Sequence, residues 1–167
     1  LERAATLAVQ GSYKNSGQRC TAVKRMLVHE AVADRFVELL VEKTRAVRYG
    51  DPADPATDMG TVIDEAAAKF FEAQVNDAVS RGAKLLYGNI RKGALYSPTV
   101  VDHVTPDMPL VKYETFGPVS PVIRFRDIDD AIRISNSTDY GLSSSVCTNR
   151  MDYITRFIAE LEVGSVN

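Results

Sequence analysis

The sequence is poor in the residues that build metal centres and disulfide frameworks. Its 167 residues include two cysteines, Cys20 and Cys147, and two histidines, His29 and His103. Neither pair has the close spacing of a metal-ligating motif, and two distant cysteines do not make a disulfide framework. We therefore expect no bound metal, and a reducing cytoplasm is the simplest location for the protein.

The sequence also lacks long runs of one kind of residue. No lysine or arginine run exceeds a pair and the net charge is -2, which disfavours a nucleic-acid partner. No apolar stretch approaches the length that crosses a bilayer, so no membrane partner is expected. With 45% apolar and 25% charged residues, the composition is typical of a globular domain with its own core.

Helical and strand-like patterns alternate along the chain. The spacing of apolar residues predicts helices over 1–14, 33–47, 64–82, 127–136 and 151–161. Short apolar or alternating runs predict strands over 23–28, 84–87, 97–101, 119–125, 142–148 and 163–166. This order predicts an α/β fold, a mostly parallel sheet with helices on both faces. Every apolar stripe is interpreted as core, and Cys147, in an alternating strand, is expected there too.

The string Gly17-Gln18-Arg19-Cys20-Thr21 is the first candidate for chemistry. It falls between a helix and a strand, where loops display side chains. A cysteine attacks a carbonyl as thiolate, and the nearby positive charges of Arg19 and Lys24 favour that form. Taken alone, the pattern fits a buried, small and inert Cys20 equally well.

The string Glu114-Thr115-Phe116-Gly117-Pro118 is the second candidate. A carboxylate in a rigid Gly-Pro turn can hold paired hydroxyls, and a neighbouring aromatic ring can meet another flat ring. The alternative is an exposed glutamate beside a core phenylalanine.

Together with three shorter strings, these two resemble the aldehyde dehydrogenase superfamily in order and separation, over nearly the whole chain. The matching strings are Ser16-Gly17-Gln18-Arg19-Cys20, Gly50-Asp51-Pro52, Glu114-Thr115-Phe116-Gly117-Pro118, Tyr140-Gly141-Leu142 and Gly164-Ser165-Val166-Asn167.

The resemblance implies a role for each matching residue. Cys20 would attack the aldehyde carbon, and its backbone amide would form half of an oxyanion hole. Glu114 would bind the ribose of an NAD or NADP cofactor, and Phe116 would pack near the nicotinamide. The implied activity is oxidation of a small-molecule aldehyde to a carboxylate through a thiohemiacetal and a thioester.

The resemblance also implies that residues 1–167 are the nucleophile-bearing catalytic domain and not the whole enzyme. The cofactor-binding domain, the oligomerisation arm, the general-base glutamate and the oxyanion-hole asparagine are expected outside this sequence. No glycine-rich dinucleotide fingerprint occurs within it. We therefore expect the chain alone to be inactive and the full-length enzyme to be a homo-oligomer.

The stretch Gly17–Arg25 is similar to that of family members that oxidise phosphonate- or phosphate-bearing aldehydes. It implies phosphonoacetaldehyde as substrate, with glyceraldehyde-3-phosphate oxidised without phosphorylation, lactaldehyde or glycolaldehyde as alternatives. Arg19 could bind the anionic group in two-pronged fashion beside the nucleophile, or could make a structural ion pair. An acylating dehydrogenase that uses coenzyme A and a non-catalytic assembly domain also remain open.

Overall fold

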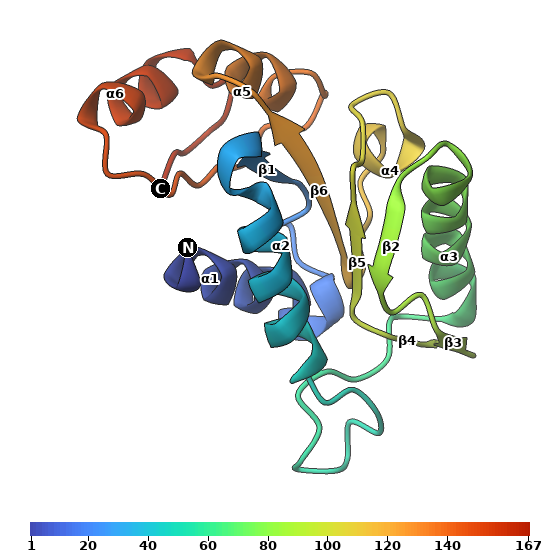
Figure 1. Ribbon diagram of the computed structural model, residues 1–167. Coiled ribbons are helices and arrows are strands. Elements are labelled where there is room, and N and C mark those ends of the chain that lie inside the picture. The colour runs from blue at the N-terminus through green and yellow to red at the C-terminus, as the bar shows by residue number, and fades with distance from the viewer.

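The computed structural model describes all residues 1–167, and helices alternate with strands along most of the chain (Figure 1). None of the helices is both long and apolar enough to cross a membrane. The helical elements are α1 (Glu2–Tyr13), the 3₁₀ turn η1 (Lys14–Gly17), α2 (Glu30–Arg45), α3 (Glu65–Ser80), α4 (Pro109–Lys112), α5 (Ile128–Ser135) and α6 (Met151–Glu160). The strands are β1 (Met26–His29), β2 (Lys84–Tyr87), β3 (Arg91–Lys92), β4 (Leu95–Tyr96), β5 (Thr99–Asp102) and β6 (Val119–Phe125).

The centre of the fold is a four-stranded sheet with the order β1-β6-β5-β2. Strands β1 and β5 both run parallel to the central β6, and β2 is antiparallel to β5 at the edge. The prediction of a mostly parallel sheet is therefore confirmed. Consecutive parallel strands need long crossovers, which explains why helices separate β1, β5 and β6 along the chain.

Helices cover both faces of this sheet, as expected. Helices α1 and α2 lie on one side and α3 and α4 on the other (Figure 1). Neighbouring residues of one strand point to opposite faces. Thus Val100 and Val122 pack in the core under α1 and α2, whereas Val101 and Ile123 pack in the core under α3.

The helix boundaries follow capping chemistry. The carboxylate of Asp64 accepts a hydrogen bond from the Ala67 amide at 2.7 Å and begins α3, as predicted. Asp127 caps α5 in the same way. The hairpin of β3 and β4, which turns at Gly93 with φ of 60°, has no counterpart among the sequence predictions. Its strands are two residues long, too short for an alternating pattern.

The two C-terminal strand predictions, over 142–148 and 163–166, are wrong as regular strands. The segments do lie side by side, but their β-pairing is limited to one parallel bridge between Ser144 and Val166. Three backbone hydrogen bonds of 2.9 Å join the segments: the Ser144 amide donates to the Ser165 carbonyl, the Val146 amide to the Asn167 carbonyl, and the Asn167 amide to the Ser144 carbonyl. Because no further strand lies beside this pair, the ladder is too short to form a sheet.

The C-terminal region also corrects two predictions about the core. Cys147 is exposed rather than buried. Of the apolar stripe predicted over 151–161, Leu161 at the C-cap of α6 is buried, but no residue within α6 is, and Met151 and Ile158 are among the most exposed large apolar residues. Periodicity predicted the helix correctly, but its apolar face is only partly covered: α6 packs against α5, and Tyr153, Ile154 and Phe157 are half-buried.

Candidate active site

The backbone that leads to Cys20 has an unusual conformation. Asn15, Ser16 and Gly17 have φ values of 54°, 55° and 71°, a region that residues other than glycine rarely occupy. Ser16 is buried, and its hydroxyl donates to the Gly60 carbonyl oxygen at 3.0 Å, which anchors the turn. Cys20 follows this turn and is exposed, so the alternative of a buried, inert thiol is not what the structure shows.

The two candidate strings meet at a pair of glycines. A Cβ atom on Gly17 would lie 2.2 Å from the carbonyl oxygen of Gly117, a distance that no real contact allows. Gly17 is therefore required both by its positive φ and by this close approach. The contact brings the loop around Cys20 against the loop around Glu114, although the two are distant in sequence.

The second loop lies between α4 and β6 and is anchored from behind. Thr115 is buried, and its hydroxyl donates to Oε1 of Gln74 on α3 at 2.9 Å. The backbone N–H of Glu114 donates to the Tyr140 hydroxyl at 3.2 Å. Glu114 and Phe116 are exposed on either side of the buried threonine. An exposed carboxylate and ring, two residues apart, can hold a sugar diol and a flat ring.

A lysine joins the two loops. The Nζ atom of Lys24 donates to the Gly17 carbonyl oxygen at 2.8 Å and lies 4.5 Å from the centroid of the Phe116 ring. Burial lowers the pKa of Lys24 below its ordinary value, and the nearby Glu114 carboxylate and Cys20 act in the opposite direction. The sequence indicated Lys24 only as a nearby charge, because its contact with Phe116 crosses between loops.

A cleft of about 710 Å³ opens at these loops. Its wall includes Cys20, Lys24, Glu114, Tyr140 and Cys147, together with apolar side chains of α5 and α6. Phe116 is not part of this wall, but its ring is 42% exposed beside Lys24. The structure therefore brings together three of the four predicted site residues, namely Cys20, Glu114 and Phe116. Tyr140 was seen in the sequence only as part of a matching string.

Arg19, the fourth predicted site residue, has a different environment. Its guanidinium donates to the carbonyl oxygens of Gly11 at 2.9 Å and Lys14 at 3.3 Å. Gly11 lies in the last turn of α1 and Lys14 is its C-cap, so Arg19 caps the C-terminal end of the helix, where the Gly11 carbonyl also accepts from the Val23 amide. Arg19 is not part of the cleft wall and forms no ion pair, so the structural ion pair that the sequence left open is absent. Its role toward a substrate stays a prediction.

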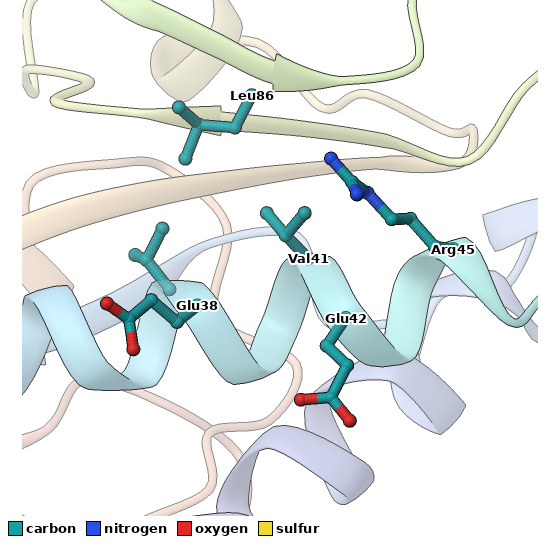
Figure 2. A pocket seen from close by; sticks show the side chains of 6 residues that line it. Glu38, Val41, Glu42, Arg45 and Leu86 are labelled. Atoms are coloured by element: carbon teal, nitrogen blue, oxygen red, sulfur yellow. The ribbon is translucent and has the colours of Figure 1, made fainter.

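A second hollow lies between α2 and β2 (Figure 2). Val41 and Arg45 extend toward the side of Leu86, whereas Glu42 points away from it. Its wall holds no cysteine, serine, histidine or tyrosine. It therefore offers no nucleophile, and the cleft at Cys20 is the better candidate site.

No group of three or more histidine, cysteine, aspartate or glutamate side chains is arranged to hold a metal ion. His29 caps α2 by accepting the Ala31 amide on Nδ1 at 3.1 Å. His103 lies 3.6 Å from the Asp102 carboxylate at the end of β5. Each histidine thus contacts a backbone or side-chain group close to it in sequence.

The fold and the cleft define a class of α/β domain that presents an exposed cysteine beside a loop bearing a carboxylate and an aromatic ring. Residues 1–167 match the model of the Aldehyde dehydrogenase family over their full length, and the chain belongs to that family.

Individual relatives agree with this assignment. A succinate-semialdehyde dehydrogenase [NADP(+)] of Mycobacterium avium is 43% identical over 169 residues, which are 99% of this chain and 36% of the relative. An NADP-dependent glyceraldehyde-3-phosphate dehydrogenase of Streptococcus equinus is 44% identical over 167 residues, 100% of this chain and 35% of the relative. The chain thus spans about a third of the length of these relatives.

The solved structure of the NADP-dependent glyceraldehyde-3-phosphate dehydrogenase from Bacillus halodurans C-125, complexed with NADP, superposes with a TM-score of 0.95. It is 43% identical, and the match covers 99% of this chain and 35% of that one. The substrates named for these relatives are a semialdehyde and glyceraldehyde-3-phosphate. They lend no support to phosphonoacetaldehyde in particular.

Proposed function

We propose that this chain supplies the nucleophile and the nicotinamide-side wall of an NAD(P)-dependent aldehyde dehydrogenase active site. The observation that carries the proposal is the close contact of Gly17 with Gly117. Through this contact an exposed cysteine and an exposed carboxylate share one cleft in a member of the Aldehyde dehydrogenase family.

The residues of this chain divide the chemistry between them. The Cys20 sulfur adds to the aldehyde carbon and forms a thiohemiacetal, and the thiol proton passes to a base. The backbone N–H of Cys20 donates to the oxygen, where negative charge develops. Loss of hydride from the same carbon leaves a thioester on Cys20. Water then adds, the carbon–sulfur bond breaks, and the carboxylate and the free thiol are released.

The cofactor fits the second loop by its chemistry. The exposed carboxylate of Glu114 can accept hydrogen bonds from both ribose hydroxyls, and the half-exposed ring of Phe116 offers a flat surface to a nicotinamide. A bound NAD or NADP would supply the acceptor for the hydride. The buried Thr115–Gln74 hydrogen bond would hold this loop in place, with Glu114 in the cleft wall and Phe116 exposed beside Lys24.

We infer an aldehyde with an anionic group as the substrate class. Succinate semialdehyde carries a carboxylate, glyceraldehyde-3-phosphate a phosphate and 3-sulfolactaldehyde a sulfonate, and enzymes named for all three are 39–44% identical to this chain. Phosphonoacetaldehyde belongs to the same chemical class. Arg19 could bind the anion only with donors that its bonds to Gly11 and Lys14 leave free.

The test of the substrate class is Arg19→Ala in the full-length protein. A substrate role raises KM for anionic aldehydes, glyceraldehyde-3-phosphate among them, while KM for acetaldehyde stays unchanged. If Arg19 only caps the C-terminal end of α1, the substitution changes KM for anionic aldehydes and KM for acetaldehyde equally and lowers the melting temperature.

The test of the proposed function is Cys20→Ser in the full-length protein, with NAD or NADP and a panel of aldehydes. We expect NAD(P)H formation to fall by about 10³-fold or more, because a hydroxyl is a far weaker nucleophile than a thiolate. Cys147→Ser is the matched control, since Cys147 is exposed and lies in the wall of the same cleft. Equal activity of wild type and Cys20→Ser would contradict the proposal.

Thiol labelling separates an enzyme from an assembly domain. Both cysteines are exposed, so access alone predicts similar rates with iodoacetamide. A nucleophilic Cys20 is modified much faster than Cys147, and NAD(P) changes its rate. Similar rates, unaffected by cofactor, favour the assembly domain. Release of an acyl-coenzyme A when coenzyme A is added identifies the acylating alternative.

A further inference from the structure

The ammonium of Lys24 closes the cysteine loop on itself. It donates to the Gly17 carbonyl oxygen at 2.8 Å, so the residue four positions after Cys20 is tied to the residue three positions before it. A hydrogen bond from a charged donor is stronger than one between neutral groups. The loop that displays Cys20 is therefore fixed at both ends by one side chain.

The same ammonium also holds the second loop. It lies 4.5 Å from the centroid of the Phe116 ring, within the range of a cation–π interaction. The cation covers one face of the ring, and 42% of the residue is still exposed. Lys24 is half-buried, and Glu114 supplies a carboxylate nearby. Arg25, the other cation of the cleft wall, instead donates to the carbonyls of Ile134 and Ser135.

We propose that Lys24 is a positioning residue that couples the loop of Cys20 to the loop of Glu114 and Phe116, by binding the Gly17 carbonyl and the Phe116 ring with one ammonium. The catalytic consequence of this coupling rests on the proposed function. The thiohemiacetal carbon, which loses the hydride, would be held by the first loop and the hydride acceptor by the second. Small errors in the distance between two reacting groups cost large factors in rate, so one cation that contacts both loops sets their register.

The variants that test this coupling are chosen to separate charge from bulk. Lys24→Met keeps an unbranched stem but removes the ammonium, and Lys24→Arg restores a cation. Lys14→Met is the control, because Lys14 is an exposed lysine near the same loop and lies outside the cleft wall. Phe116→Leu removes the aromatic partner of Lys24 while leaving the bond to Gly17 possible.

The main readout is amide hydrogen exchange by mass spectrometry on the full-length protein, which needs no turnover. In Lys24→Met we expect exchange to rise by about tenfold in residues 17–24 and also in residues 114–118. Lys24→Arg restores most of the protection in both loops, and Lys14→Met leaves it unchanged. In a Phe116→Leu background, Lys24→Met adds little further exchange in residues 114–118.

Three results would overturn the coupling. They are faster exchange of Lys24→Met in residues 17–24 alone, no faster exchange in either loop, or the same increase in exchange in Lys14→Met. In kinetics we expect Lys24→Met to raise KM for NAD(P) by about fivefold and to lower kcat, with Lys24→Arg restoring KM. If Cys20→Ser keeps full turnover, the proposed function fails, while the exchange result still decides whether Lys24 joins the two loops.

Discussion

At the scale of single residues, Gly17 is one of two positions, with Gly88, where a positive φ coincides with a backbone carbonyl 2.2 Å from the Cβ position. Its φ of 71° is left-handed, and the Gly117 carbonyl occupies the place of a Cβ atom at 2.2 Å. We expect Gly17→Ala to lower the free energy of unfolding by about 3 kcal/mol or more and to slow Cys20 labelling. Chemical denaturation and iodoacetamide kinetics measure the two effects.

Gly93 provides the matched control for this prediction. Its φ of 60° is similar, but no atom lies within 4 Å of its Cβ position. Gly93→Ala should therefore cost about 1 kcal/mol, the penalty of the left-handed backbone alone. Equal losses in the two variants would show that the contact with Gly117 contributes nothing.

At the scale of elements, the buried hydrogen bond between Thr115 and Gln74 connects helix α3 to the second loop of the site. Nε2 of Gln74 already has no partner, so Thr115→Val leaves a second polar atom of the same amide unpaired. We expect a loss of about 1–3 kcal/mol in the free energy of unfolding, measured by urea denaturation. The double variant Gln74→Leu with Thr115→Val should lose less than the sum of the two single changes. A loss in the double variant equal to the sum of the two single losses would argue against the Thr115–Gln74 hydrogen bond.

Elements with a strong local signal were predicted well. Strand β6 was predicted over 119–125 and occupies those residues, because its buried run is bounded by Pro118 and the capping Asp127. Strand β2 also agrees with its prediction. The short β3–β4 hairpin and the single bridge at Ser144 depend on neighbouring chain segments, which no local pattern reports.

At the scale of the whole molecule, Tyr13 joins α1 and α2 to the sheet. Its buried hydroxyl donates to the Thr99 carbonyl at 3.3 Å and accepts from Ser120 at 2.9 Å and Thr44 at 3.4 Å. Burial raises the pKa of Tyr13 to about 12 from its ordinary 10.0. Its stabilising contribution is therefore complete below pH 10 and falls as the pH rises toward 12, because the unfolded chain loses the proton first.

We expect this tyrosine to lower the free energy of unfolding by about 2–3 kcal/mol between pH 10 and pH 12. Burial also raises the pKa of Tyr96, so both tyrosines act in the same direction. Tyr13→Phe should be less stable at neutral pH but should lose less stability on going to pH 12. Urea denaturation at each pH measures this, and identical pH slopes in wild type and variant would refute it.

The second prediction for the whole molecule concerns residues 1–167 as an isolated chain. The carboxylates in the cleft wall are Glu114, which we propose binds the ribose, and Asp139. The resemblance to the family implies that the general-base glutamate lies outside residues 1–167. We therefore expect no aldehyde oxidation by this chain with NAD or NADP above the rate of the Cys20→Ser variant. Turnover at a normal rate would refute the inference that the general base comes from other residues.

The pattern of residues along the chain was enough to predict the class of fold and to name candidate residues for the proposed chemistry. Cys20, Glu114 and Phe116 were named from two short strings, and the alternation of patterns predicted the mostly parallel sheet. Periodicity and turn residues report how one segment will be buried, so they are reliable within an element. They contain no information about which distant segments become neighbours.

Tertiary structure decided the rest. Only the tertiary path of the chain places Gly17 against Gly117 and the Lys24 ammonium over the Phe116 ring. It also places the Arg19 guanidinium where it donates to the Gly11 carbonyl in the last turn of α1. The same path leaves the apolar face of α6 only partly covered, with no fully buried side chain. These features depend on pairwise contacts between loops, and such contacts are fixed by the packing of whole elements rather than by local pattern.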